Sequence, residues 1–202
     1  MSLTWLKKHP EYKTTLTNKL QKHEVSLNAN KFKDLYAEFS TMPNVTSALT
    51  ELLLKANIDP LMYMNYIPQH YLYASDVYIN FEPLKHFDSI DEGAFAFSGV
   101  KEINVNVPVI FFGAFSRCKK LEIVTLPTIR TIDMEAFYMC ENLTQLWVGK
   151  SLVEITKDAF EGCNSLTDIF YEGTQEDWDK IYIHPRNTEI LDATVHFNSI
   201  VK

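Results

Sequence analysis

The chain has 202 residues, of which 46% are apolar and 22% charged, and it contains 13 Phe, 10 Tyr and 3 Trp. This composition is that of a globular protein with a sizeable core, and it excludes disorder along most of the chain. The net charge of −7 is unevenly spread, because residues 1–70 hold 8 Lys and 6 acidic residues while residues 71–202 hold 11 Lys or Arg and 20 acidic residues. Since an acidic surface repels phosphates, we expect neither a nucleic acid nor an anionic membrane surface as a partner.

The sequence shows no segment that predicts insertion into a membrane or export. No run of apolar residues reaches the roughly 18 that a transmembrane helix needs. The start of the chain, Met1–Lys8, lacks the apolar stretch and the small-residue cleavage site of a secretory signal. We therefore expect a cytoplasmic protein.

Residues 1–66 are typical of helices and form a predicted N-terminal helical domain or cap. Apolar residues recur three or four positions apart, as on one face of a helix. The expected helices are Tyr12–His23, a second one capped by Asn30, and Val45–Ala56 capped by Asn44. The pattern ends at Asn57–Pro60, because proline disfavours a helical conformation in the residue before it.

From residue 67 to residue 171 the sequence repeats itself in about five copies, the strongest signal in the chain. An isoleucine stands five residues before each phenylalanine anchor, an alanine directly before it, and a serine or cysteine three residues after every anchor. An alternation of apolar residues, typical of a strand, closes each of the last four copies. The anchors recur at intervals of 23, 20, 22 and 23 residues: Leu72, Phe95, Phe115, Phe137 and Phe160.

One copy of about 22 residues is expected to form a single coil with one short strand, and it cannot bury its apolar face alone. Stacking the copies aligns the repeated positions into ladders and buries a continuous core. The sequence therefore predicts an α+β protein, in which a small helical region precedes a solenoid with a short parallel β-sheet.

The repeated pattern resembles the BspA-like leucine-rich repeats. The stretches that carry the likeness are "SIDEGAFAFSGVKEINV", "VIFFGAFSRCKKLEIVTLP", "TIDMEAFYMCENLTQLWV" and "EITKDAFEGCNSLTDIFYEG". The stretch from Tyr171 to Ile181 is similar to the terminal segment of such arrays, so residues 172–202 are a predicted C-terminal capping segment. Family members are commonly surface proteins with many copies. Five copies and no evident export signal favour a small stand-alone intracellular or phage-type member.

The titratable residues do not form a recognisable catalytic or metal site. Cys118, Cys140 and Cys163 are spaced by the repeat period, so we expect them in one buried column. A zinc site favours closely paired ligands such as Cys-x₂-Cys, and the six histidines are scattered. No nucleotide-binding loop or nucleophile motif is present. We therefore expect no metal, no cofactor and no enzymatic activity.

The residues between the inward positions of each strand point outward, because side chains alternate faces along a strand. We expect one apolar patch rimmed by polar groups, formed by Ile123, Trp147 and Phe170. Such a patch is typical of a protein interface. The complete outward set, which is the predicted partner-binding site, is Glu102, Asn104, Ile123, Thr125, Gln145, Trp147, Asp168 and Phe170.

The leading functional hypothesis is a non-enzymatic module that binds a protein partner through this sheet face. In the alternative interpretation of the patch, the C-terminal segment or the N-terminal helices cover it, or it forms a dimer contact. A second functional hypothesis is an acidic inhibitor that occupies the nucleic-acid-binding cleft of a target protein. A third is a structural protein that self-assembles through open solenoid ends. The sequence does not indicate the oligomeric state.

Overall fold

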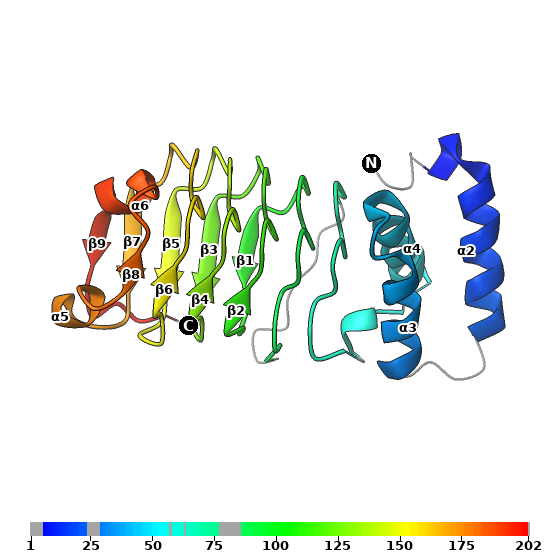
Figure 1. Ribbon diagram of the computed structural model, residues 1–202, viewed down its shortest axis with the longest axis horizontal. Helices are drawn as coiled ribbons and strands as arrows, with labels where there is room; N and C mark the ends of the chain where they lie inside the picture. The colour runs from blue at the N-terminus through cyan, green and yellow to red at the C-terminus, as the bar shows by residue number, and fades with distance from the viewer. Residues whose placement is uncertain (1–5, 24–28, 57, 63, 77–85, 202) are drawn as a thin grey trace.

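The computed structural model describes residues 6–23, 29–56, 58–62, 64–76 and 86–201. It is an elongated solenoid with helices packed on one end (Figure 1). This architecture confirms the predicted α+β class and the parallel repeat sheet. No described helix has the length and apolar character needed to cross a membrane.

A five-stranded parallel sheet in the order β1-β3-β5-β7-β9 forms one side of the solenoid. Its strands cover Glu102–Asn104 (β1), Ile123–Leu126 (β3), Gln145–Val148 (β5), Asp168–Tyr171 (β7) and Thr194–His196 (β9). From β1 to β7 each strand lies one repeat further along the chain, so equivalent positions face each other. The inward residues of β3 and β5 are buried and their neighbours are half-buried, which confirms the predicted alternation.

A second parallel sheet, in the order β2-β4-β6-β8, forms another side of each coil, so the expectation of one strand per coil was wrong. The additional strands are only two residues long: Val109–Ile110 (β2), Thr131–Ile132 (β4), Glu154–Ile155 (β6) and Tyr182–Ile183 (β8). Their inward members are the repeated isoleucines, which continue through Ile67 and Ile90 as isolated bridges. The isoleucine column indicated burial, but two-residue strands are too short to show an alternation.

The core is a set of ladders that run along the solenoid axis. The rings of Phe95, Phe115, Phe137 and Phe160 stack in sequence, with centroids 5.0, 5.2 and 5.1 Å apart. These rings are at most 1% exposed. They lie close to the separation of adjacent coils, which is set by strand pairing at about 4.8 Å. The predicted register of the anchors is therefore confirmed.

The cysteine column is buried, as predicted, and it also donates hydrogen bonds. The thiols of Cys118, Cys140 and Cys163 lie 3.0, 3.2 and 3.1 Å from phenylalanine carbonyl oxygens of preceding coils. Burial, together with its two cysteine neighbours, raises the pKa of the Cys140 thiol well above its ordinary value. The thiol therefore stays protonated, as a hydrogen-bond donor must.

Each coil turns through backbone positions in the left-handed region. Phe97, Arg117 and Met139 occupy one of them with φ between 58° and 61°, where the equivalent residue of the following coil is Gly162. Such a conformation costs a non-glycine residue about 1–2 kcal/mol. Hydrogen bonds to the next coil hold these residues in place, including that from Arg117 N to Tyr138 O at 2.7 Å.

The N-terminal helices are α2 (Pro10–His23), α3 (Ala29–Phe39) and α4 (Pro43–Lys55), followed by the 3₁₀ turn η1 (Pro60–Met62). Two predicted caps were wrong. Asn30 lies inside α3, and Asn44 is the second residue of α4, because Pro43 begins that helix and Met42 is its N-cap. Proline favours the first helical position because its fixed φ is helical and it lacks an N–H to satisfy.

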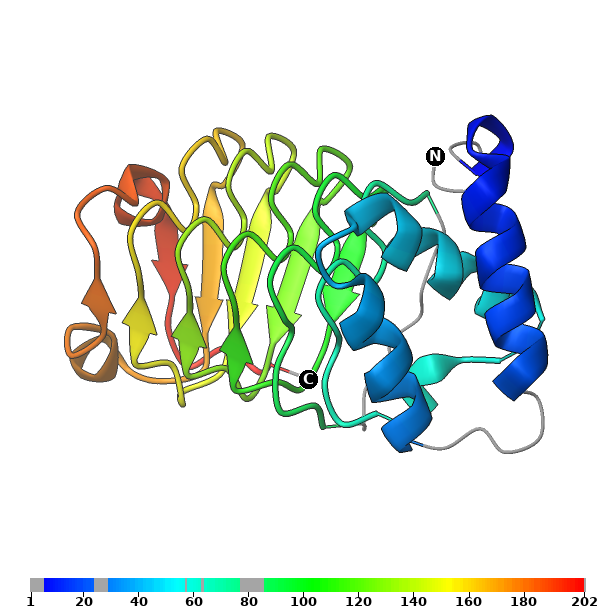
Figure 2. The same cartoon turned by 45° about the vertical axis from the view of Figure 1, so that its right-hand side comes forward.

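Helices α3 and α4 close one end of the solenoid by packing on its first coil (Figure 2). The ring of Tyr36 lies 5.9 Å from that of Tyr71, which contacts Phe95 at 6.1 Å. The hydroxyl of Ser75 donates to the carboxylate of buried Glu51 at 2.6 Å. The aromatic core is thus continuous from the helices into the repeats.

The other end is closed by α5 (Gln175–Trp178), β8, α6 (Thr188–Asp192) and β9. In the earlier coils the backbone N–H groups of Phe137 and Met139 donate to carbonyls of the next coil. At the last coil, side chains take over this role. Phe160 N donates to Asn187 Oδ1 at 3.0 Å, and Gly162 N donates to a carboxylate oxygen of Glu189 at 2.6 Å.

Candidate functional site: the outward face of the five-stranded sheet

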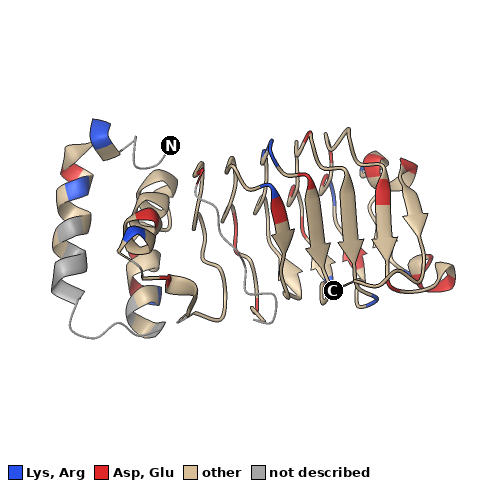
Figure 3. Cartoon of the chain, turned by 180° about the vertical axis from the view of Figure 1, so that it is seen from behind, with Lys and Arg blue, Asp and Glu red and all other residues tan. Residues whose placement is uncertain are grey.

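The five-stranded sheet is seen from its outward side in Figure 3, and its outward residues form two parallel rows. The strand pairing fixes their members residue by residue. The first, which we call the polar row, is Glu102, Ile123, Gln145, Asp168 and Thr194. The second, the aromatic row, is Asn104, Thr125, Trp147, Phe170 and His196. The structure thus brings all eight predicted site residues onto one face, and it adds two.

Three rings of the aromatic row form a continuous stack. The ring centroids of Trp147 and Phe170 lie 3.8 Å apart with 10° between their planes. The imidazole of His196 stacks on the other face of Phe170, at 4.6 Å and 14°. All three residues are half-buried. The stack stands upright on the sheet, because parallel rings that follow the strand spacing present their edges outward.

Ile123 occupies a different place from the one expected. It pairs with Gln145 in the polar row, so it lies diagonally from Trp147 rather than beside it. Diagonal neighbours on a sheet are about 7–8 Å apart, still within reach of long side chains. The apolar patch therefore consists of the aromatic stack, with Ile123 at its margin.

Polar side chains fix the orientation of the stacked rings. The indole N–H of Trp147 donates to Gln145 Oε1 at 3.2 Å. His196 Nε2 lies 2.7 Å from Asp168 Oδ1, and the hydroxyl of Thr167 donates to Asp168 Oδ2 at 2.8 Å. These hydrogen bonds, that from His196 first, lower the pKa of Asp168. The carboxylate of Asp168, in the polar row, therefore stays ionised at neutral pH.

The helices and the C-terminal segment lie at the ends of this face rather than over it. Helices α3 and α4 pack on one end of the solenoid with α2 outside them, and α5 and α6 lie at the opposite end (Figures 1 and 3). Strand β9 extends the sheet beside β7. The segment beyond β9 turns back along the strand ends, where Ser199 N donates to Tyr171 O at 3.0 Å.

Sequence reasoning missed Thr194 and His196, because they follow two helical turns and belong to no copy of the repeat. A signal was nevertheless present. Val195 and Phe197 alternate with His196 and pack against the core, as the apolar residues of a half-buried strand do. This alternation spans too few residues to indicate that the strand joins the repeat sheet.

The described residues include no group of three or more His, Cys, Asp or Glu side chains that could hold a metal ion. The Asp168–His196 pair is flanked by Thr167, whose hydroxyl donates to Asp168 rather than to the imidazole. That hydroxyl therefore faces a carboxylate whose pKa is lowered, which makes it a weak base for the activation of a nucleophile. The arrangement suits recognition by shape, stacking and hydrogen bonds.

No curated protein matches this chain. A solved structure of a leucine-rich cell surface protein from Faecalibacterium prausnitzii is similar to it, with 20% sequence identity and a TM-score of 0.39. The similarity covers 54% of this chain and 35% of that one, so the chain spans about a third of the length of its relative. The model of the BspA-type leucine-rich-repeat region matches residues 65–182 in six copies, one more than the sequence indicated. Because this match covers more than half of the residues, the chain belongs to the BspA-type leucine-rich-repeat family.

Proposed function

We propose that the protein is a non-enzymatic interaction module that binds a partner protein through the outward face of the five-stranded sheet. The observation that carries the proposal is the stack of Trp147, Phe170 and His196, half-buried and flanked by the polar row. Aromatic side chains at the centre of a polar rim are typical anchors of protein interfaces. Stacked repeats present extended surfaces that suit this task.

The stack ends beside shorter side chains, which leaves room for a partner. On one side of Trp147 lies Phe170, and on the other the aromatic row continues with Thr125 and Asn104. The side chain of Asn104 is exposed and that of Thr125 is half-buried. A side chain from a partner can therefore rest on these two residues and pack against the indole.

Site-specific photocrosslinking tests the proposal. A photoreactive amino acid replaces Thr125 on the sheet face, or Asn164 on an exposed turn as the matched control. We expect a partner crosslinked in the host cell from position 125 and not from position 164. With that partner purified, Trp147→Ala should weaken its binding by about thirtyfold, as expected for a hot-spot aromatic side chain.

Two outcomes would contradict this proposal. One is a partner that binds the folded Trp147→Ala variant as tightly as the original chain. The other is equal crosslinking from positions 125 and 164. A salt series on the same complex separates it from the acidic-inhibitor alternative, because binding through charge mimicry weakens steeply with ionic strength.

A further inference from the structure

The four-stranded sheet carries a second surface, on a different side of the coils from the aromatic row. Residues directly after the buried isoleucines point outward and lie in register across three coils. They are Asp91, Phe111 and Asp133, so an aromatic ring stands between two carboxylates. Glu92 and Phe112 directly follow Asp91 and Phe111, so here too a carboxylate on one coil lies beside a phenylalanine on the next. Together with Gln69, these five residues line a hollow of about 340 Å³.

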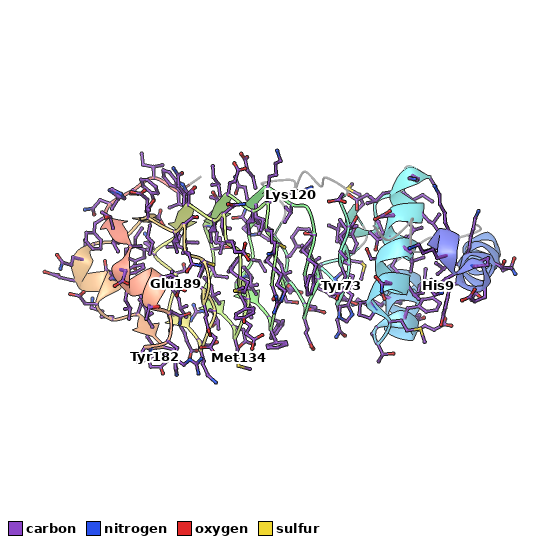
Figure 4. All side chains as sticks on the ribbon, turned by 90° about the horizontal axis from the view of Figure 1, so that it is seen from above. His9, Tyr73, Lys120, Met134, Tyr182 and Glu189 are labelled. Atoms are coloured by element: carbon purple, nitrogen blue, oxygen red, sulfur yellow. The ribbon has the colours of Figure 1, made fainter. Side chains whose placement is uncertain are left out.

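Both phenylalanines of this hollow are unusually exposed. Phe111 is 42% exposed and Phe112 38%, while the anchor phenylalanines of the same repeats are at most 1% exposed. Met134, 38% exposed, follows Asp133 in the next coil, whereas Tyr182, 54% exposed, lies further along the solenoid and pairs with Glu154. Figure 4 shows both residues on one edge of the solenoid. Exposed phenylalanine side chains side by side on one surface are typical of a contact with another macromolecule.

The three carboxylates of the hollow have no lysine or arginine partner within the described chain; the imidazole of His70, whose pKa burial lowers, is close enough to Glu92 for the carboxylate to offset part of that effect. No described lysine or arginine forms an ion pair with Asp91, Glu92 or Asp133. Lys33, which lines the adjoining hollow with Asp91, lies over the ring of Tyr66. Partial burial raises the pKa of Asp91 even though Ser89 donates to it, so its negative charge is poorly compensated.

Charge and shape together indicate what the hollow accepts. Three carboxylates favour a cation, and exposed phenylalanine faces attract a cationic side chain through their quadrupole. A guanidinium group satisfies both demands, since it is planar, stacks on rings and donates to carboxylates with a fixed geometry. The exposed side chains of Phe112 and Met134 favour a cation that is carried on a larger, partly apolar segment.

We infer that this acidic-aromatic hollow is a second docking site, which receives an arginine side chain of a partner protein between Phe111, Phe112 and the carboxylates of Asp91 and Asp133. This hollow is separate from the aromatic row, because it lies along the four-stranded sheet and the aromatic row lies on the five-stranded sheet. The apolar residues that flank the arginine contact the exposed side chains of Phe112 and Met134.

A pair of peptides that differ only in charge tests this inference on the full chain. The probe is acetyl-leucyl-arginyl-leucine amide, and its counterpart carries citrulline, which is planar and of equal length but neutral. Binding is followed by NMR through the ring resonances of the two phenylalanines. We expect the arginine peptide to bind about fivefold more tightly than the citrulline peptide, because only its guanidinium makes cation–π and ionic contacts.

Substitutions locate the effect. Asp91→Asn with Asp133→Asn should abolish the preference for arginine. Phe111→Ala should reduce this preference, and because the Phe111 ring is exposed, its loss should leave the fold intact. Glu122→Gln with Glu176→Gln changes the net charge equally at two distant exposed positions and should preserve the preference.

Three results would overturn the inference: equal binding of both peptides, no binding of either, or an equal loss in the distant double variant, which would indicate general attraction to an acidic protein. Trp147→Ala should leave arginine-peptide binding unchanged. The inference therefore fails or succeeds separately from the proposed function of the sheet face.

Discussion

Gly149 shows how closely one coil approaches the next. A Cβ atom built on this residue would lie 1.8 Å from the carbonyl oxygen of Pro127 in the preceding coil. Overpacking against backbone cannot be relieved by a rotamer change, so Gly149→Ala should lower the free energy of unfolding by about 3 kcal/mol. Denaturant unfolding measures this difference.

Gly113 is the matched control for this effect. Its φ of +59° is strained for any L side chain, but the nearest atom to a Cβ there is Ser116 Cβ at 3.8 Å. Gly113→Ala should therefore cost only about 1 kcal/mol, the left-handed penalty alone. Equal losses in the two variants would show that steric contact with Pro127 is not what restricts position 149.

The Asp168–His196 hydrogen bond makes stability depend on pH in a defined direction. Because hydrogen bonds lower the pKa of Asp168 in the folded chain, its contribution is present above the unfolded-state value of about 3.9 and is lost as pH falls through the folded value. The difference in melting temperature between the original chain and Asp168→Asn should shrink below about pH 4. Asp192→Asn, at an exposed position on α6, should show a smaller change.

At the scale of elements, one buried side chain makes three of the hydrogen bonds that join the C-terminal cap to the last coil and order its own turn. Asn187 accepts from Phe160 N and donates to the carbonyls of Thr156 and His184, at 2.8 and 3.1 Å. Asn187→Ala would leave these groups without partners in a buried site and should lower the free energy of unfolding by about 3 kcal/mol. Amide exchange at Phe160 should accelerate in the same variant.

Thr188→Ala provides the comparison at the neighbouring position. Its hydroxyl is exposed and donates to Glu189 Oε2 at 3.2 Å, so we expect a change within about 0.5 kcal/mol. A loss as large as that of Asn187→Ala would mean that α6 as a whole, and not the three hydrogen bonds, closes the solenoid.

The elements also show which parts of the fold the sequence could predict. The phenylalanine and cysteine ladders were predictable, because stacking forces equivalent positions into contact and the period reveals them. The left-handed turns were not, since Phe97 and Arg117 are poor sequence signals for a positive φ. The start of α4 was misplaced for a related reason, because Pro43 and not Asn44 determines it.

The candidate site was predictable to the extent that it follows the repeat. Trp147 and Phe170 are one period apart and were correctly placed on one face. His196 lies beyond the repeat, so only the fold shows that it completes the stack. The acidic-aromatic hollow also escaped sequence analysis. Phe111 and Phe112 read as part of an apolar run, and only the register of the second sheet places carboxylates on both sides of Phe111.

At the scale of the whole molecule, both ends of the solenoid are covered. Helices α3 and α4 pack on the first coil, and the side chains of Asn187 and Glu189 replace the carbonyls of a further coil at the last one. The outer strands β8 and β9 are only two and three residues long. Short edge strands are a means by which proteins avoid edge-to-edge pairing. We therefore expect the full chain to remain monomeric in light scattering over a wide concentration series.

Removal of residues 172–202 tests whether the C-terminal segment prevents end-to-end association. The deletion frees the backbone N–H groups of Phe160 and Gly162 and exposes the four-residue edge of β7. These unpaired backbone groups can form hydrogen bonds with a coil of another copy, so the shortened chain should form concentration-dependent oligomers. Full-length Asn187→Ala, which retains β8 and β9, is the control and should stay monomeric despite its lower stability. A shortened chain that is folded and monomeric at all concentrations would show that the last coil does not attract another copy, and would remove self-assembly through this end.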